Sequence, residues 1–182
     1  MRFTRWTAGS LLAAIMFTSG VTGCGSNGGG EGAPVNGAAA ATLPDSLFLP
    51  AAPESAPGVA DAKTGAAAGQ PITLRGRIGG SRTPFVDGRA AFTIVGAGPA
   101  ACSDTPGDEC RTPWDYCCEP RESLAKHSAT IRIVDAAGQP LKVNAKGARG
   151  LRELSEIIVV GTVAQSEGDL LVVDATGIFI VQ

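Results

Sequence analysis

Histidine, aromatic residues and an excess of positive charge are all scarce in this chain of 182 residues. His127 is the only histidine, aromatic residues make up 5% of the chain, and 15 Lys/Arg stand against 17 Asp/Glu. Nucleic-acid binding needs cations that neutralise phosphates and rings that stack on bases, so this composition argues against it. One histidine and no nucleophile-elbow motif also argue against a hydrolase. We therefore expect no catalytic residues and a protein that is not an enzyme.

Two familiar motifs are missing or incomplete. No C-x-x-C pair occurs, which removes the best sequence support for redox catalysis by the cysteines. The stretch "IVGAGPAA" (94–101) looks like the glycine-rich turn of dinucleotide-binding enzymes. However, two prolines and scattered turn residues follow in 102–115, where that motif requires a helix. We expect these glycines to shape the end of a strand and the beginning of a loop.

The N-terminus has the features of a secretion signal. Arg2 and Arg5 precede an apolar stretch around 11–17, which ends in small residues and the sequence VTGC at 21–24. This pattern is typical of a signal peptide, and the segment is too short for a spanning helix. Residues 21–24 resemble the lipobox of bacterial lipoproteins, which implies cleavage before Cys24 and lipidation of its thiol. We expect residues 1–23 to be a lipoprotein signal peptide; the alternative is an ordinary signal peptide cut elsewhere.

Lipidation of Cys24 predicts a protein of the cell envelope, held to a membrane by several acyl chains. Gly25, and not Asp, follows the cysteine, so nothing suggests retention in an inner membrane. We expect attachment to an outer membrane, with the protein facing the periplasm or the cell surface. Its partners would be the membrane and an envelope ligand or protein that the sequence does not identify.

Residues 24–70 are rich in Gly, Ala and Pro and show no period of 2 or 3.6. Such a segment buries too little apolar surface to offset the entropy of ordering it, so we expect a disordered tether after the lipidated cysteine. One apolar island, "LPDSLFLP" at 43–50, interrupts it. We expect this island to pack weakly on the following domain or on nothing.

Residues 71–182 are expected to form one all-β domain with one short helix. Alternation of apolar and polar residues predicts strands in 72–78, 90–96 and 129–135, and two apolar strands follow in 157–164 and 169–181. The helix is expected in 148–156, where Leu151 and Leu154 are three residues apart. This order resembles the OB-fold, a five-stranded Greek-key barrel, which implies a cysteine-containing loop between the second and third strands. The resemblance implies a fold and transfers no activity.

Four cysteines lie in residues 102–120, here called the cysteine loop: Cys102, Cys110, Cys117 and Cys118. Two disulfides are the preferred interpretation, because the envelope is oxidising and adjacent cysteines can each pair upstream. The alternative is a metal site for zinc, copper or an iron–sulfur centre, with His127 able to replace one thiol. If the disulfide interpretation holds, the protein has no cofactor and a binding or structural role.

Acidic residues outnumber arginines around these cysteines, which favours the approach of cations and disfavours reactive thiolates. Trp114 and Tyr116 are expected to form a small satellite core beneath the loop. His127 is interpreted as a surface or hydrogen-bonded residue without a catalytic role.

Overall fold

The structure is a computed structural model, and it describes residues 42–182. The predicted signal peptide (1–23), the predicted lipidation site Cys24 and the first part of the predicted tether lie outside the described residues. None of the helices within 42–182 has the length and apolar character needed to cross a membrane.

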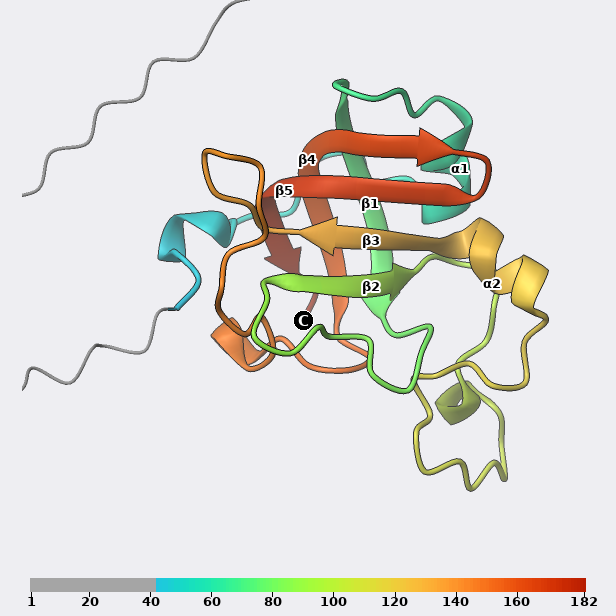
Figure 1. Ribbon diagram of the computed structural model, residues 1–182. Coiled ribbons are helices and arrows are strands. Elements are labelled where there is room, and N and C mark those ends of the chain that lie inside the picture. Colours follow the sequence, from blue (N-terminus) through green and yellow to red (C-terminus); the bar gives the residue numbers. More distant parts are fainter. Residues whose placement is uncertain (1–41) are drawn as a thin grey trace, which may run out of the picture. The chain divides into compact units, whose positions relative to one another are not determined.

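Five strands form a closed barrel in the order β1-β2-β3-β5-β4, and Figure 1 shows how they wrap around a common interior. β3 runs parallel to β5, and every other neighbouring pair is antiparallel. This confirms the predicted all-β, OB-like barrel with the cysteines between the second and third strands. The strands are β1 (Pro71–Ile78), β2 (Ala91–Val95), β3 (Ser128–Arg132), β4 (Glu156–Glu167) and β5 (Leu170–Ile180).

The alternation along each strand decides which side chains fill the barrel. In β1, Leu74 and Ile78 are fully buried, whereas Arg75 between them is exposed. β4 and β5 are joined by Gly168 and Asp169, and Gly168 has a φ of +54°, which favours glycine in a tight hairpin. The main core includes side chains from all five strands, among them Leu74, Ile78, Phe92, Ile94, Ile131, Ile157, Val159, Val173 and Ile178.

Residues 42–70, predicted as part of the tether, are folded onto the barrel. The island that surrounds the short 3-10 helix η1 (Asp45–Leu47) places Leu43 and Leu47 in the main core, where they are 5% and 4% exposed. The amide of Leu49 donates a 2.8 Å hydrogen bond to the carbonyl of Ile178 on β5. The structure therefore differs from the tether prediction here, because isolated apolar residues without a period can still fill gaps beside a barrel.

Residues 42–70 are here called the N-terminal arm, and helix α1 (Val59–Thr64) lies within it. Val59 at its first position is completely buried in the main core. Lys63 near its end donates hydrogen bonds from Nζ to the carbonyl oxygens of Ala125 (2.7 Å) and Asp169 (2.6 Å). The arm thus contacts both the region before β3 and the β4–β5 turn.

The helix predicted at 148–156 is absent from the structure. Only a 3-10 turn, η3 (Ala148–Gly150), forms there, and Arg149 and Leu154 have φ values of +48° and +63°. Leu151 enters the main core, whereas Leu154 packs on a separate cluster beneath the cysteine loop. The prediction was wrong because these two leucines serve different cores and so do not share one helical face.

A helix occurs instead before β3. Helix α2 (Arg121–His127) follows the cysteine loop directly and leads into β3. In Figure 1 the loop between β2 and α2 projects from the end of the barrel beneath α2. Residues 94–101 end β2 and begin this loop, as expected; only the short 3-10 helix η2 (Cys102–Asp104) follows them, and the next α-helix is α2.

Candidate metal centre

The cysteine loop is attached to the barrel where β1 ends. The amide of Gly80 donates a 2.8 Å hydrogen bond to the carbonyl oxygen of Trp114. A Cβ atom on Gly79 would lie 2.6 Å from that same oxygen, so only glycine allows the loop to come this close. The indole Nε1 of Trp114 donates to the carbonyl of Arg82 at 3.1 Å. These contacts fix the middle of the loop against the β1–β2 connection.

Tyr116 anchors the loop from beneath. Its side chain is 2% exposed and packs with Val95 and Ala101, and Leu124 and Leu154 pack around them. This confirms a satellite core under the loop for Tyr116, whereas Trp114, the other predicted member, is only half-buried and lies outside this cluster. Burial raises the pKa of the Tyr116 phenol. Tyr116 has a φ of +58°, which turns the chain between Asp115 and Cys117.

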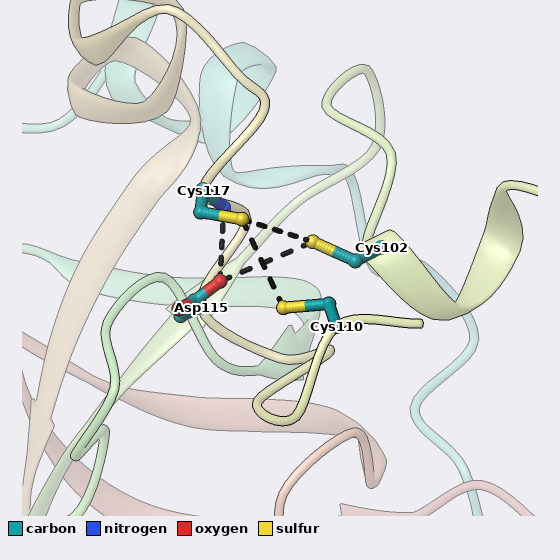
Figure 2. A group of neighbouring side chains, drawn as sticks. All are labelled: Cys102, Cys110, Asp115 and Cys117. Atoms are coloured by element: carbon teal, nitrogen blue, oxygen red, sulfur yellow. Dashed lines mark hydrogen bonds between the residues drawn. The ribbon is translucent and has the colours of Figure 1, made fainter. Parts of the chain in front are cut away.

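Three thiols and one carboxylate point toward one another in the cysteine loop (Figure 2). Cys102 comes from the short 3-10 helix η2 (Cys102–Asp104), whereas Cys110, Asp115 and Cys117 come from the later part of the loop. One donor atom from each of the four side chains lies within 4.8 Å of all the others. Cys102 and Cys117 are fifteen positions apart in the sequence, so only the fold of the loop brings their thiols together.

The distances between sulfurs distinguish two kinds of chemistry. Cys117 Sγ lies 3.6 Å from Cys102 Sγ and 3.8 Å from Cys110 Sγ. A disulfide requires about 2.05 Å, whereas two thiolates on a tetrahedral zinc ion lie ~3.8 Å apart because each Zn–S bond is about 2.3 Å. Within residues 42–182 all four cysteines are free, so neither of the two preferred disulfides is formed there.

Asp115 is held in place by two hydrogen bonds from its own loop. Thr112 Oγ1 donates to Oδ2 at 2.8 Å, and the amide of Cys117 donates to Oδ1 at 2.9 Å. Oδ1 also lies 3.9 Å from Cys102 Sγ. In the sequence, Asp115 is only one of several acidic residues around the cysteines. An Asp side chain commonly accepts a hydrogen bond from the backbone amide two residues later. Asp115 stands two residues before Cys117, and this spacing is the local signal that could have identified it as a member of the site.

The loop changes the acidity of these groups in opposite directions. Hydrogen bonding with Cys102, and then with Cys110 and Cys118, raises the pKa of the Cys117 thiol. Burial raises the pKa of Cys102, whereas a backbone hydrogen bond at Thr112 lowers that of Cys110. Partial burial opposes ionisation of Asp115, but the hydrogen bond from Thr112 and that from the Cys117 amide outweigh it and lower its pKa. Metal binding at these thiols would therefore release protons.

Two other predicted candidates, Cys118 and His127, do not belong to this group of four donors. Cys118 is exposed, and its Sγ lies 4.0 Å from Cys117 Sγ, so the adjacent cysteines do not point apart. Among the described residues, His127 belongs to no group of side chains that could together hold a metal ion. Its Nδ1 lies 2.7 Å from the carbonyl oxygen of Ser123 in α2. This contact agrees with the interpretation of His127 as a hydrogen-bonded residue.

Comparison with known proteins adds no family: protein-family models, curated proteins and solved structures all gave no significant match to this chain.

Proposed function

We propose that this protein is a lipid-anchored protein of the cell envelope whose barrel presents a thiolate-bound metal ion. One observation carries the proposal: the sulfurs of Cys102, Cys110 and Cys117 converge with a carboxylate oxygen of Asp115 at spacings that suit one tetrahedral ion. The role is binding, with no catalytic residue assigned. The lipid anchor at Cys24 remains part of the proposal on the strength of residues 21–24 alone.

The donor set indicates the class of metal. Thiolates are soft ligands that select zinc, copper(I) or iron–sulfur centres over magnesium or calcium. A donor set of three sulfurs and one oxygen fits a mononuclear, four-coordinate zinc ion, and soft thiolates also suit copper(I). The many carboxylates near the loop give it a negative electrostatic potential, which attracts cations.

Metal binding explains the loop better than thiol redox chemistry does. A reactive cysteine is normally a stable thiolate in electropositive surroundings. Here the pKa values of Cys102 and Cys117 are raised, and the nearby charged residues are mainly acidic. A cation would supply the positive charge that these thiols need in order to ionise.

The test is elemental analysis together with a thiol count on full-length protein purified without chelator. We expect zinc or copper bound to the chain, and cysteines of the loop that react with a thiol reagent only after a chelator removes the metal. Protein without metal and with a mass lower by about four hydrogens than its reduced form would instead show two disulfides, since each S–S bond removes two thiol hydrogens. That outcome would overturn the proposal.

A matched pair of variants separates ligation from folding. Asp115→Asn keeps an acceptor for the Thr112 hydroxyl but removes the anionic donor, so we expect weaker metal binding. Asp87→Asn makes the same chemical change at an exposed position outside the donor groups and should bind metal as the native chain does. Equal metal affinity in both variants would show that Asp115 is not a ligand.

A further inference from the structure

The four donors Cys102, Cys110, Asp115 and Cys117 are here called the first donor set, and this set does not include Cys118 and Asp108. These two residues form a second group with Cys102, in which the two sulfurs and one carboxylate oxygen all lie within 4.8 Å of one another. Cys102 therefore belongs to both groups. It is also the most enclosed of the four cysteines, at 2% exposed.

A tight turn keeps Cys117 and Cys118 close to both groups. The amide of Glu119 donates a 3.0 Å hydrogen bond to the carbonyl of Tyr116, so the adjacent cysteines are the two central residues of a β-turn. Their sulfurs are 4.0 Å apart. The turn thus presents one thiol to Cys110 and Asp115, and the other to Asp108.

Asp108 is tied to the first donor set through the backbone. Its Oδ1 accepts a 2.8 Å hydrogen bond from the amide of Cys110. Asp108 and Cys110 are therefore held in a fixed relation, as Asp115 and Cys117 are. Each group combines a carboxylate with a cysteine or a cysteine pair, and each includes the thiol of Cys102.

We propose that the cysteine loop binds two metal ions of the zinc or copper(I) class, one in each donor group, with the Cys102 thiolate bridging them. This inference rests on the proposed function and adds a second site to it. A thiolate sulfur has enough lone pairs to bind two ions, and bridging sulfurs occur in clusters held by cysteines. Each thiol that binds releases its proton to solvent, and the oxidation state of sulfur does not change.

Charge favours the second ion. With one divalent ion in the first donor set, its three thiolates and the carboxylates of Asp115 and Asp108 would carry five negative charges, of which the ion would offset only two. Repulsion among the remaining anions would weaken the binding of a single ion, and a second cation would reduce that repulsion. Cys118 and Cys117 are exposed, which leaves a route from solvent for the second ion.

The experiment loads reduced, full-length protein with Zn²⁺ alone under anaerobic conditions and counts bound ions by native mass spectrometry. We expect two ions in the native chain and one in Cys118→Ser and in Asp108→Asn. Asp115→Asn should also retain one ion, and Cys102→Ser should lose at least one because it removes the shared thiolate. Asp87→Asn is the control and should keep two ions.

The outcomes separate this inference from the proposed function. One ion in the native chain and one in Cys118→Ser would overturn the second site but leave the proposed function intact. No ion in the native chain would overturn both. Two ions in the native chain and still two in both Cys118→Ser and Asp108→Asn would place the second ion elsewhere and overturn the assignment. In cadmium-113-loaded protein, two resonances coupled through a shared sulfur would support the bridge, and two uncoupled resonances would contradict it.

Discussion

Arg77 on β1 and Asp104 at the end of η2 form an ion pair, with 2.5 Å between Nη1 and Oδ2. Asp104 Oδ2 also accepts a 3.3 Å hydrogen bond from the amide of Ala101. The pair therefore joins a barrel strand to the turn that carries Cys102. It is the one ion pair among the described residues that connects the barrel to the cysteine loop.

The first prediction concerns the pH dependence of this pair. The hydrogen bond from Arg77 lowers the pKa of Asp104, so its stabilising effect is fully present above the unfolded value of about 4 and is lost as pH falls through the lower, folded value. Since the side chains are 31% and 44% exposed, Arg77→Met should lower the free energy of unfolding by at most about 1 kcal/mol at neutral pH.

Urea unfolding at a series of pH values checks this prediction. The difference between the native chain and Arg77→Met should shrink once Asp104 is protonated in both. Arg89→Met, at an exposed position in the β1–β2 connection, should show a small difference without that acid dependence. A difference for Arg77→Met that stays constant down to strongly acidic pH would contradict the assigned role.

The second prediction concerns the close approach of the cysteine loop to the barrel. In Gly79→Ala, the new Cβ would lie 2.6 Å from Trp114 O and 2.8 Å from Tyr116 Cε2. The loop must shift, so we expect a loss of about 1–3 kcal/mol in stability and weaker metal binding. Gly65→Ala is the control, because its Cβ would meet nothing within 4 Å. Metal titration and thermal unfolding of both variants measure the effect, and identical behaviour would contradict the assigned contact.

The third prediction concerns the N-terminal arm. Leu47 is 4% exposed in the main core, so Leu47→Ala should reduce the free energy of unfolding by about 2–5 kcal/mol. Leu170 is 46% exposed, and Leu170→Ala should change it by only about 0.5 kcal/mol. Denaturant unfolding of both variants compares them. Equal, small effects would mean that residues 42–70 behave as a tether after all.

The fourth prediction concerns membrane attachment. Cys24→Ser removes the thiol that the lipobox-like residues 21–24 would present for lipidation, so the protein should move from the membrane fraction to the soluble fraction. Cys118→Ser removes a cysteine of the loop and should leave fractionation unchanged. Membrane association of Cys24→Ser equal to that of the native chain would defeat the lipoprotein proposal.

Local sequence pattern was sufficient to predict the barrel strands: alternation for the first three and apolar runs for the last two. In 72–78 every second position is taken by Ile72, Leu74, Gly76 and Ile78, and this period specifies one buried face whatever the neighbouring strand is. The helix predicted at 148–156 was wrong because the spacing of Leu151 and Leu154 says nothing about which core each side chain enters. The arm at 42–70 was missed for a related reason, since Leu43, Leu47 and Val59 follow no period and gain their burial only from contacts distant in sequence.

The candidate site, too, was predictable only in the features that depend on order along the chain. The sequence by itself determined the cysteine count, the absence of C-x-x-C, and the position of the loop between the second and third strands, because these depend on order along the chain. Only the tertiary structure decided that Cys102, Cys110 and Cys117 meet at Asp115, and that Cys118 lies beside Cys117. The physical reason is that Gly79, Tyr116 and Arg77 fix the path of a loop whose own residues carry no period. The distances between the sulfurs depend on this path, and the path depends on contacts with the barrel.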